Sequence, residues 1–197
     1  PMKWLMTAMQ SMMPDEVRQG TGTLFVDIGC AAGIQLVRAV TDGGYDYAVG
    51  YELPGNKAAY KVAAPPPNNV HIEWADATAV DLSHILRVRS GVRAISFFTF
   101  WQGFTFATQK KVFFKLCDFA MENNAIHVTA AFVHSGHFIQ KGNFAVWLEE
   151  WVSQKGMASK RQHINFENNA EYVEFSDVVQ SGGKGSYKAL AINLSSM

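Results

Sequence analysis

Several features are scarce in this sequence, and each scarcity excludes a class of protein. The 17 basic residues are matched by 17 acidic ones, so no overall field attracts the chain to nucleic acid or an anionic membrane, and such a partner would need a local patch. Only two cysteines, Cys30 and Cys117, are present, which excludes a disulfide scaffold and favours an intracellular protein with free thiols. No stretch approaches the roughly 20 apolar residues that span a bilayer, so no membrane partner is expected.

What the sequence does contain is the composition of a globular protein. Of its 197 residues, 48% are hydrophobic and 17% are charged, which is enough to bury a sizeable core. No repeat, linker or low-complexity segment interrupts the chain, and its histidines, cysteines and acids do not cluster as metal ligands do. We therefore expect one domain over residues 1–197, without a metal.

Helical and strand patterns alternate along the chain. An N-terminal helical segment over 1–20 precedes the first strand. Apolar strand segments then recur at 23–28, 47–53, 70–76, 94–100 and 125–133. Helices are predicted after the first, second, fourth and fifth of them, the second helix over 56–64. The tail differs, because the alternating segments 171–179 and 187–194 are joined only by QSGGKGS and should form an antiparallel hairpin.

Strands that alternate with helices predict a parallel sheet covered on both faces, because each parallel step needs a crossover that a helix supplies. With the C-terminal hairpin included, the sheet should have about seven strands, most of them parallel. Ligands of such sheets bind beyond the carboxyl ends of the strands, where the strand order reverses. The loops that follow the strands are therefore the place to look for a site.

The stretch LFVDIGCAAGIQLVRAV, residues 24–40, contains the first of these loops. Asp27 ends the strand, and Gly29 and Gly33 flank Cys30 and Ala31 in the loop that leads into the helix. Glycines permit a tight turn and a close approach of a ligand to the backbone. An acid just before the loop would repel a pyrophosphate, so the loop suits a ligand that carries a cationic group.

At these residues the chain resembles the class I S-adenosylmethionine-dependent methyltransferases, whose first motif is an acid followed by alternating glycines. Their cofactor carries an ammonium and a sulfonium, and here Ala31 stands in place of the middle glycine. The resemblance implies a Rossmann-like α/β fold with S-adenosylmethionine as cofactor. It also implies that the cofactor lies against the loop residues Asp27, Gly29, Cys30, Ala31 and Gly33.

Two further acids match the same class. Glu52 ends the second predicted strand, where the resemblance implies that a carboxylate accepts hydrogen bonds from both ribose hydroxyls. Asp76, followed by Ala77, ends the third strand, where the resemblance implies that an acid accepts from the adenine amino group. Three acids at three successive strand ends are hard to obtain by chance.

A narrower likeness covers about residues 24–135. The stretches LFVDIG, GYELPGNKAAYKVA and HIEWADA are similar to the Dot1 family of histone-lysine methyltransferases. The resemblance implies a protein lysine, in a histone or nucleosome, as the methyl acceptor, and a nuclear location; without it, a cytoplasmic location is expected. The sequence departs from that family where the fourth strand ends: the family has an asparagine pair followed by an aromatic residue, and here the same place reads Phe98-Thr99-Phe100, without either asparagine.

The acceptor site is predicted from the residues at this strand end. The stretch SFFTFWQGF predicts an acceptor pocket formed by Phe98, Thr99, Phe100 and Trp101, with Phe97 and Phe104 in the core. An aromatic, water-poor channel disfavours an ammonium and so lowers the pKa of a lysine acceptor. Two alternatives remain open: a methyltransferase that acts on RNA or a small molecule, and an interaction module that keeps the fold without catalysis.

Overall fold

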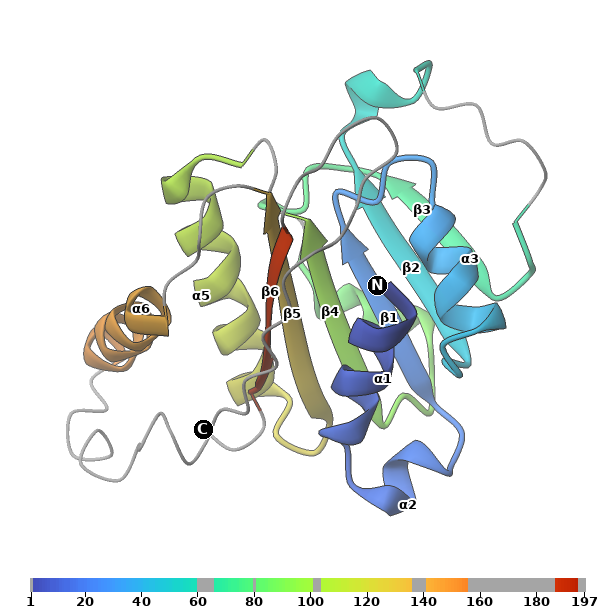
Figure 1. Cartoon of the computed structure of the whole chain (residues 1–197), viewed down its shortest axis with the longest axis horizontal. Helices are drawn as coiled ribbons and strands as arrows, with labels where there is room; N and C mark the ends of the chain where they lie inside the picture. Colours follow the sequence, from blue (N-terminus) through green and yellow to red (C-terminus); the bar gives the residue numbers. More distant parts are fainter. Residues whose placement is uncertain are drawn as a thin grey trace.

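The computed structural model describes residues 2–59, 66–79, 81–100, 104–135, 141–155 and 187–194. These residues form one six-stranded sheet in the order β3-β2-β1-β4-β5-β6 (Figure 1). The strands are β1 (Thr23–Ile28), β2 (Tyr47–Glu52), β3 (Val70–Trp74), β4 (Ala94–Phe100), β5 (His127–Ser135) and β6 (Tyr187–Asn193). The helical segments are α1 (Met2–Ser11), α2 (Asp15–Arg18), α3 (Ile34–Thr41), η1 (Pro54–Asn56), α4 (His84–Val88), α5 (Phe106–Glu122) and α6 (Lys141–Gln154).

The sheet has the predicted parallel topology with one antiparallel strand. Strands β1 to β5 pair in parallel, whereas β6 runs antiparallel to β5. The chain passes outward from β1 through β2 to β3 and then returns to the other side of β1 with β4, so the strand order reverses between β1 and β4. The predicted fold class is therefore confirmed, while the first strand of the predicted hairpin, 171–179, lies outside the described residues.

Helices cover both faces of the sheet, and each face has its own hydrophobic cluster. In Figure 1, α1 and α3 lie in front of the sheet and α4 lies behind it. Residues of α1 and α3 join one cluster, and residues of α4, α5 and α6 join the other. In α1, Leu5, Met6 and Met9 are fully buried, so a helix is present in the predicted N-terminal helical segment, and these side chains join the cluster on one face of the sheet.

Strand β4 shows how the two faces divide the side chains. Phe97 packs edge-on against Phe119 of α5, with ring centroids 5.4 Å apart. Its neighbour Phe98 points to the opposite face and stacks on Phe25 of β1 at 6.0 Å. Both rings are buried, and each contributes about 1.5–3 kcal/mol to folding.

One predicted helix differs in the structure. The segment expected to be helical over 56–64 begins with the 3-10 turn η1 (Pro54–Asn56), continues as a turn to residue 59, and then leaves the described residues. In the described part the backbone makes i→i−3 hydrogen bonds, such as the one from the Ala59 N–H to the Asn56 carbonyl oxygen at 2.9 Å, which are those of a 3-10 turn. The turn instead places Asn56 beside the end of β2.

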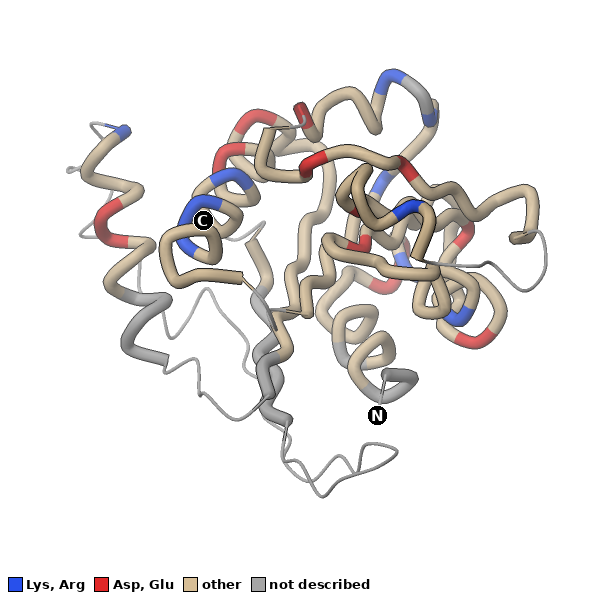
Figure 2. The backbone as a smooth tube through the Cα atoms, turned by 90° about the horizontal axis from the view of Figure 1, so that it is seen from above, with Lys and Arg blue, Asp and Glu red and all other residues tan. Residues whose placement is uncertain are grey.

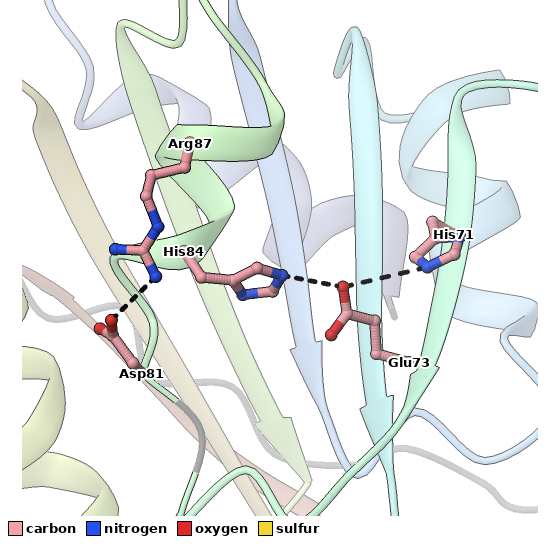
Figure 3. Close-up of polar contacts among 5 residues, drawn as sticks. All are labelled: His71, Glu73, Asp81, His84 and Arg87. Carbon is pink, nitrogen blue, oxygen red and sulfur yellow. Dashed lines mark hydrogen bonds and ion pairs between the residues drawn. The ribbon is translucent and has the colours of Figure 1, made fainter.

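Among the described residues, Lys and Arg positions are interspersed with Asp and Glu positions along the backbone (Figure 2). A set of polar contacts joins α4 to β3, which is one edge strand of the sheet (Figure 3). His84 Nε2 lies 3.2 Å from Glu73 Oε1, and His71 Nε2 lies 3.9 Å from the same oxygen. Arg87 pairs with Asp81 at 3.1 Å. Because these side chains are partly or fully exposed, water screens the contacts and they add little to the stability of the fold.

Gly50 in β2 provides the room that the loop after β1 needs. A Cβ atom at this position would lie 2.4 Å from Cys30 Sγ and 2.6 Å from Leu36 Cδ1. Both of those side chains are buried, so neither can move aside cheaply. The glycine two residues before Glu52 thus allows the loop and the start of α3 to pack directly on the strand.

We expect Gly50→Ala to lower the free energy of unfolding by about 1–3 kcal/mol, because the added methyl group overpacks this contact. Gly55→Ala is the matched control, since nothing lies within 4 Å of the Cβ position there. Urea denaturation of the two variants measures the difference. Equal stability of the two variants would contradict the close packing at Gly50.

Candidate functional site

A cavity of about 510 Å³ lies at the carboxyl ends of the parallel strands, beside the point where the strand order reverses. Its size is typical of a site for a small molecule. It is lined by residues from the loops after β1, β2, β3 and β4 and from the start of α5: Ile28, Gly29, Ala31, Tyr51, Glu52, Leu53, Asn56, Ala75, Asp76, Ala77, Thr78, Phe100, Phe104, Thr105 and Thr108.

The loop after β1 is held in a tight turn by the end of β2. The N–H groups of Gly29 and Cys30 both donate to the carbonyl oxygen of Tyr51, at 2.8 and 3.1 Å. Gly29, Ala31 and Gly33 all have positive φ, at 82°, 49° and 77°. For Ala31 this conformation costs about 1–2 kcal/mol, which explains why the related motif has a glycine there. The loop therefore presents backbone rather than bulky side chains to the cavity.

Glu52 connects this loop to the turn after β2. Its Oε2 accepts a hydrogen bond from the Ala31 N–H at 2.8 Å. Its Oε1 accepts from the Leu53 N–H at 3.0 Å and from Asn56 Nδ2 at 2.7 Å. The side chain is only 7% exposed, and it lines the cavity. Three donors thus fix a buried carboxylate that lines the cavity.

Asp76, which follows β3, also lines the cavity. Its Oδ1 accepts from both the N–H and the hydroxyl of Thr78, each at 2.8 Å. The backbone hydrogen bond, followed by the hydroxyl, lowers the pKa of Asp76, so this exposed carboxyl is ionised near neutral pH. Among the described residues its other oxygen accepts no hydrogen bond and is available to a ligand donor.

The aromatic residues at the end of β4 are arranged differently from the prediction. Phe100 lines the cavity, as expected, but Phe98 is buried in the core against Phe25, and Thr99 is fully buried. Phe104, predicted to be core, lines the cavity, with its ring 3.6 Å from the Cβ position at Gly29. Phe98 belongs to the hydrophobic cluster that contains residues of α1, and it is not among the residues that line the cavity. Trp101 lies outside the described residues.

The other predicted site residues divide into two groups. Gly29, Ala31, Glu52, Asp76 and Ala77 come together around the cavity. The cavity is not lined by the other three, Asp27, Cys30 and Gly33. Asp27 and Cys30 are buried instead. A Cβ atom at Gly33 would lie 2.7 Å from Ile72 Cδ1 of β3, so this glycine is needed for packing.

Asp27, at the end of β1, and Cys30, in the loop that follows it, are both buried. Asp27 is 2% exposed, and its Oδ1 has no hydrogen-bond partner among the described residues. Burial, followed by the nearby Glu52 carboxylate, raises the pKa of Asp27 to about 8. Burial, followed by the charges of Asp27 and Glu52, also raises the pKa of the Cys30 thiol. Near neutral pH, Asp27 is thus mostly a neutral acid and not the carboxylate that the motif suggests.

This burial predicts a pH-dependent stability. The folded protein holds the Asp27 proton up to about pH 8, whereas the unfolded chain releases it near 3.8. The free energy of unfolding should therefore fall between these pH values, by on the order of 1 kcal/mol per pH unit, and level off above them. Asp27→Asn removes the titrating group, so the difference in stability between variant and wild type should grow from about pH 5 to about pH 8. Urea denaturation curves that give a constant difference would contradict this prediction.

Several lining residues were not predicted from the sequence. Thr105 and Thr108 lie in no motif, and Asn56 and Phe104 lie in the quoted stretches but were given no role at the site; only the structure brings these residues to the cavity. Gln109 anchors this part of the wall, since its Nε2 donates to the Phe104 carbonyl oxygen at 3.1 Å. Thr105 caps α5 by accepting from the Thr108 N–H at 3.2 Å. The Thr105 cap, a threonine ahead of an apolar helical pattern, is the one feature that the sequence could have revealed.

Comparisons with known proteins agree with this fold. No family model matches the sequence, and no curated protein matches it significantly. Among solved structures, the methyltransferase domain of bacterial CtHen1-CN is similar, with a TM-score of 0.55 at 10% identity, covering 98% of this chain and 96% of that one. The CtHen1-C form gives a TM-score of 0.54 at 10% identity, covering 98% and 95% of the two chains.

At this level of identity the likeness shows the fold alone. The chain has the α/β Rossmann-like fold of these methyltransferase domains, as the sequence motifs predicted. Nothing in these likenesses indicates the Dot1 family. Within the described residues, no helix is long and apolar enough to cross a membrane.

Proposed function

We propose that this protein binds S-adenosylmethionine in the cavity and transfers its methyl group to an acceptor. The observation that supports this most directly is the fixed Glu52 carboxylate, which faces the Gly29–Ala31 loop on one side of the cavity while Asp76 stands on another. The fold shared with methyltransferase domains adds support.

The residues present fit each part of that cofactor. Glu52 offers an anionic acceptor to ribose hydroxyls, and the ionised Asp76 offers one to the adenine amino group. Between these acids, the apolar side chains of Leu53, Ala75 and Ala77 provide surfaces for a flat base. The loop at Gly29, free of a side chain, permits close approach of the amino-acid portion.

When bound, S-adenosylmethionine supplies an electrophilic methyl group on its sulfonium. The protein's part is then to hold an acceptor atom in line with that group and to exclude water. Phe100 and Phe104 line the same cavity and provide an apolar wall for this purpose. In this proposal no described side chain is needed as a dedicated base.

For the acceptor we propose RNA. Thr108, Lys111 and Lys115 recur at i, i+3 and i+7 and so share one face of α5, which begins at the cavity. Lys115 Nζ donates to the carbonyl oxygens of Ala77 and Thr78, at 3.4 and 3.1 Å, and so lies beside the wall of the cavity. Exposed Lys111, one turn away, adds a cation near the same wall. These lysines form a local basic patch for phosphates, and the aromatic rings suit stacked bases.

A protein lysine, which the sequence resemblance to Dot1 implies, is the second candidate. The observation that favours it is the apolar wall of Phe100 and Phe104, since an aromatic environment lowers the pKa of a lysine amino group. The asparagine pair of that family is missing here, and Thr99, at one of those positions, is buried. RNA therefore stands first.

Cofactor binding should depend on both acids. In calorimetric titration we expect S-adenosylmethionine to bind with a Kd near micromolar, a binding free energy of about −8 kcal/mol. We expect Glu52→Ala and Asp76→Ala each to raise this Kd about tenfold or more. Asp81→Ala is the matched control, because Asp81 Oδ1 accepts from the Ser83 N–H at 2.9 Å in a similar turn that does not line the cavity. A folded wild-type protein without detectable binding would leave an interaction module instead of an enzyme.

The acceptor is tested by transfer of a radiolabelled methyl group to RNA, histones and nucleosomes. We expect RNA to be labelled, and Lys111→Glu to lower this labelling about tenfold while the affinity for S-adenosylmethionine changes less than about twofold. Arg18→Glu makes the same change in net charge on α2, which lies at the far end of the sheet (Figure 1), and should have little effect. Labelling of histones without RNA would favour the lysine acceptor instead.

A further inference from the structure

The Glu52 carboxylate is already engaged by the protein on most of its acceptor sites. A carboxylate has two oxygens with about four lone-pair positions. Leu53 N–H and Asn56 Nδ2 occupy both positions on Oε1, and Ala31 N–H occupies one on Oε2. Only one position, on Oε2, remains for a ligand. A vicinal diol that donates both hydroxyls to Glu52 would have to displace one of these donors, and at this nearly buried site the loss of a partner is costly.

Asn56 is placed to supply the missing acceptor. Its amide must turn the NH₂ group toward Glu52, because an ionised carboxylate can only accept hydrogen bonds. The amide oxygen Oδ1 is therefore at the other end, and none of the described residues donates to it. Asn56 is half-buried and lines the cavity together with Glu52. The η1 turn holds it there, since its own N–H donates to the Leu53 carbonyl oxygen at 2.9 Å.

We infer that Asn56 is a cofactor-binding residue: its side-chain oxygen accepts one hydroxyl of the ribose diol, while Glu52 Oε2 accepts the other. This inference rests on the proposed function, because it assigns a nucleoside ligand to the cavity. Asn56 then acts twice, since the same amide also positions the Glu52 carboxylate through its NH₂ group. The pair Glu52–Asn56 therefore forms one unit that recognises two adjacent hydroxyls without losing a hydrogen bond of the protein.

The experiment is a binding cycle between side chain and ligand. Calorimetric titration compares S-adenosylhomocysteine with two analogues, each of which lacks one of the two ribose hydroxyls, on wild type, Asn56→Ala and Asn69→Ala. Asn69 is the matched control, because its Nδ2 also makes one hydrogen bond, to the Asp46 carbonyl oxygen at 2.8 Å, away from the cavity. We expect Asn56→Ala to raise the Kd of S-adenosylhomocysteine about tenfold or more. Asn69→Ala should change this Kd less than about twofold.

The cycle separates a direct contact from a structural effect. The analogue that lacks the hydroxyl bound by Asn56 should bind wild type about tenfold more weakly than S-adenosylhomocysteine does. In Asn56→Ala the same change in the ligand should have only a slight effect, because the side chain that accepts this hydroxyl is already absent. Equal losses in both proteins, for both analogues, would overturn the inference while leaving the proposed function intact. Wild type that does not bind S-adenosylhomocysteine at all would overturn the proposed function itself.

A second variant protects the test against a folding defect in Asn56→Ala. Asn56→Asp keeps the shape and the acceptor oxygen but places a like charge 2.7 Å from Glu52. We expect Asn56→Asp to raise the Kd of S-adenosylhomocysteine more than Asn56→Ala does. Circular dichroism confirms that each variant is folded.

Discussion

The hydrogen bond from the Ala31 N–H to Glu52, at 2.8 Å, is the contact on which the arrangement of the cavity depends. It ties the loop after β1 to the end of β2 and so fixes the backbone that faces the cavity. The loop in turn requires positive φ at Ala31 and an empty Cβ position at Gly50. A conformation that is unfavourable for alanine is thus stabilised by a hydrogen bond to a nearly buried carboxylate.

Burying that carboxylate has consequences for the groups beneath it. Asp27 lies in the same low-dielectric region, and two negative charges so close together would be costly. The structure avoids this cost because Asp27 holds its proton up to about pH 8, while Glu52 receives three hydrogen-bond donors. The acid of the first motif therefore supports the loop as a neutral group, and the acid at the end of β2 carries the charge that faces the ligand.

The sequence predicted the features that depend on local pattern. Apolar runs bounded by turns placed β1 and β4 at the observed residues, and acids after strands placed Glu52 and Asp76 at one cavity. Strand alternation also showed that Phe97 and Phe98 face opposite sides. It could not show how far along β4 the core extends, so Phe98 was placed in the pocket although it is buried, and Phe104, beyond the strand, was placed in the core although it lines the cavity.

The features that the sequence could not give all depend on contacts between distant segments. The protonated state of Asp27 arises from the layers that bury it, and no motif records that. Asn56 reaches the cavity only because a 3-10 turn forms where an α-helix was expected. Its role beside Glu52 becomes visible only when the hydrogen bonds of the carboxylate are counted.

A crystal structure of the protein with S-adenosylhomocysteine is the most direct measurement. If the cavity is a methyltransferase cofactor site, the ligand should lie along the Gly29–Ala31 loop, with its ribose at Glu52 and its adenine beside Asp76. Ligand density elsewhere on the protein, or a ligand in the cavity that contacts neither acid, would contradict this assignment.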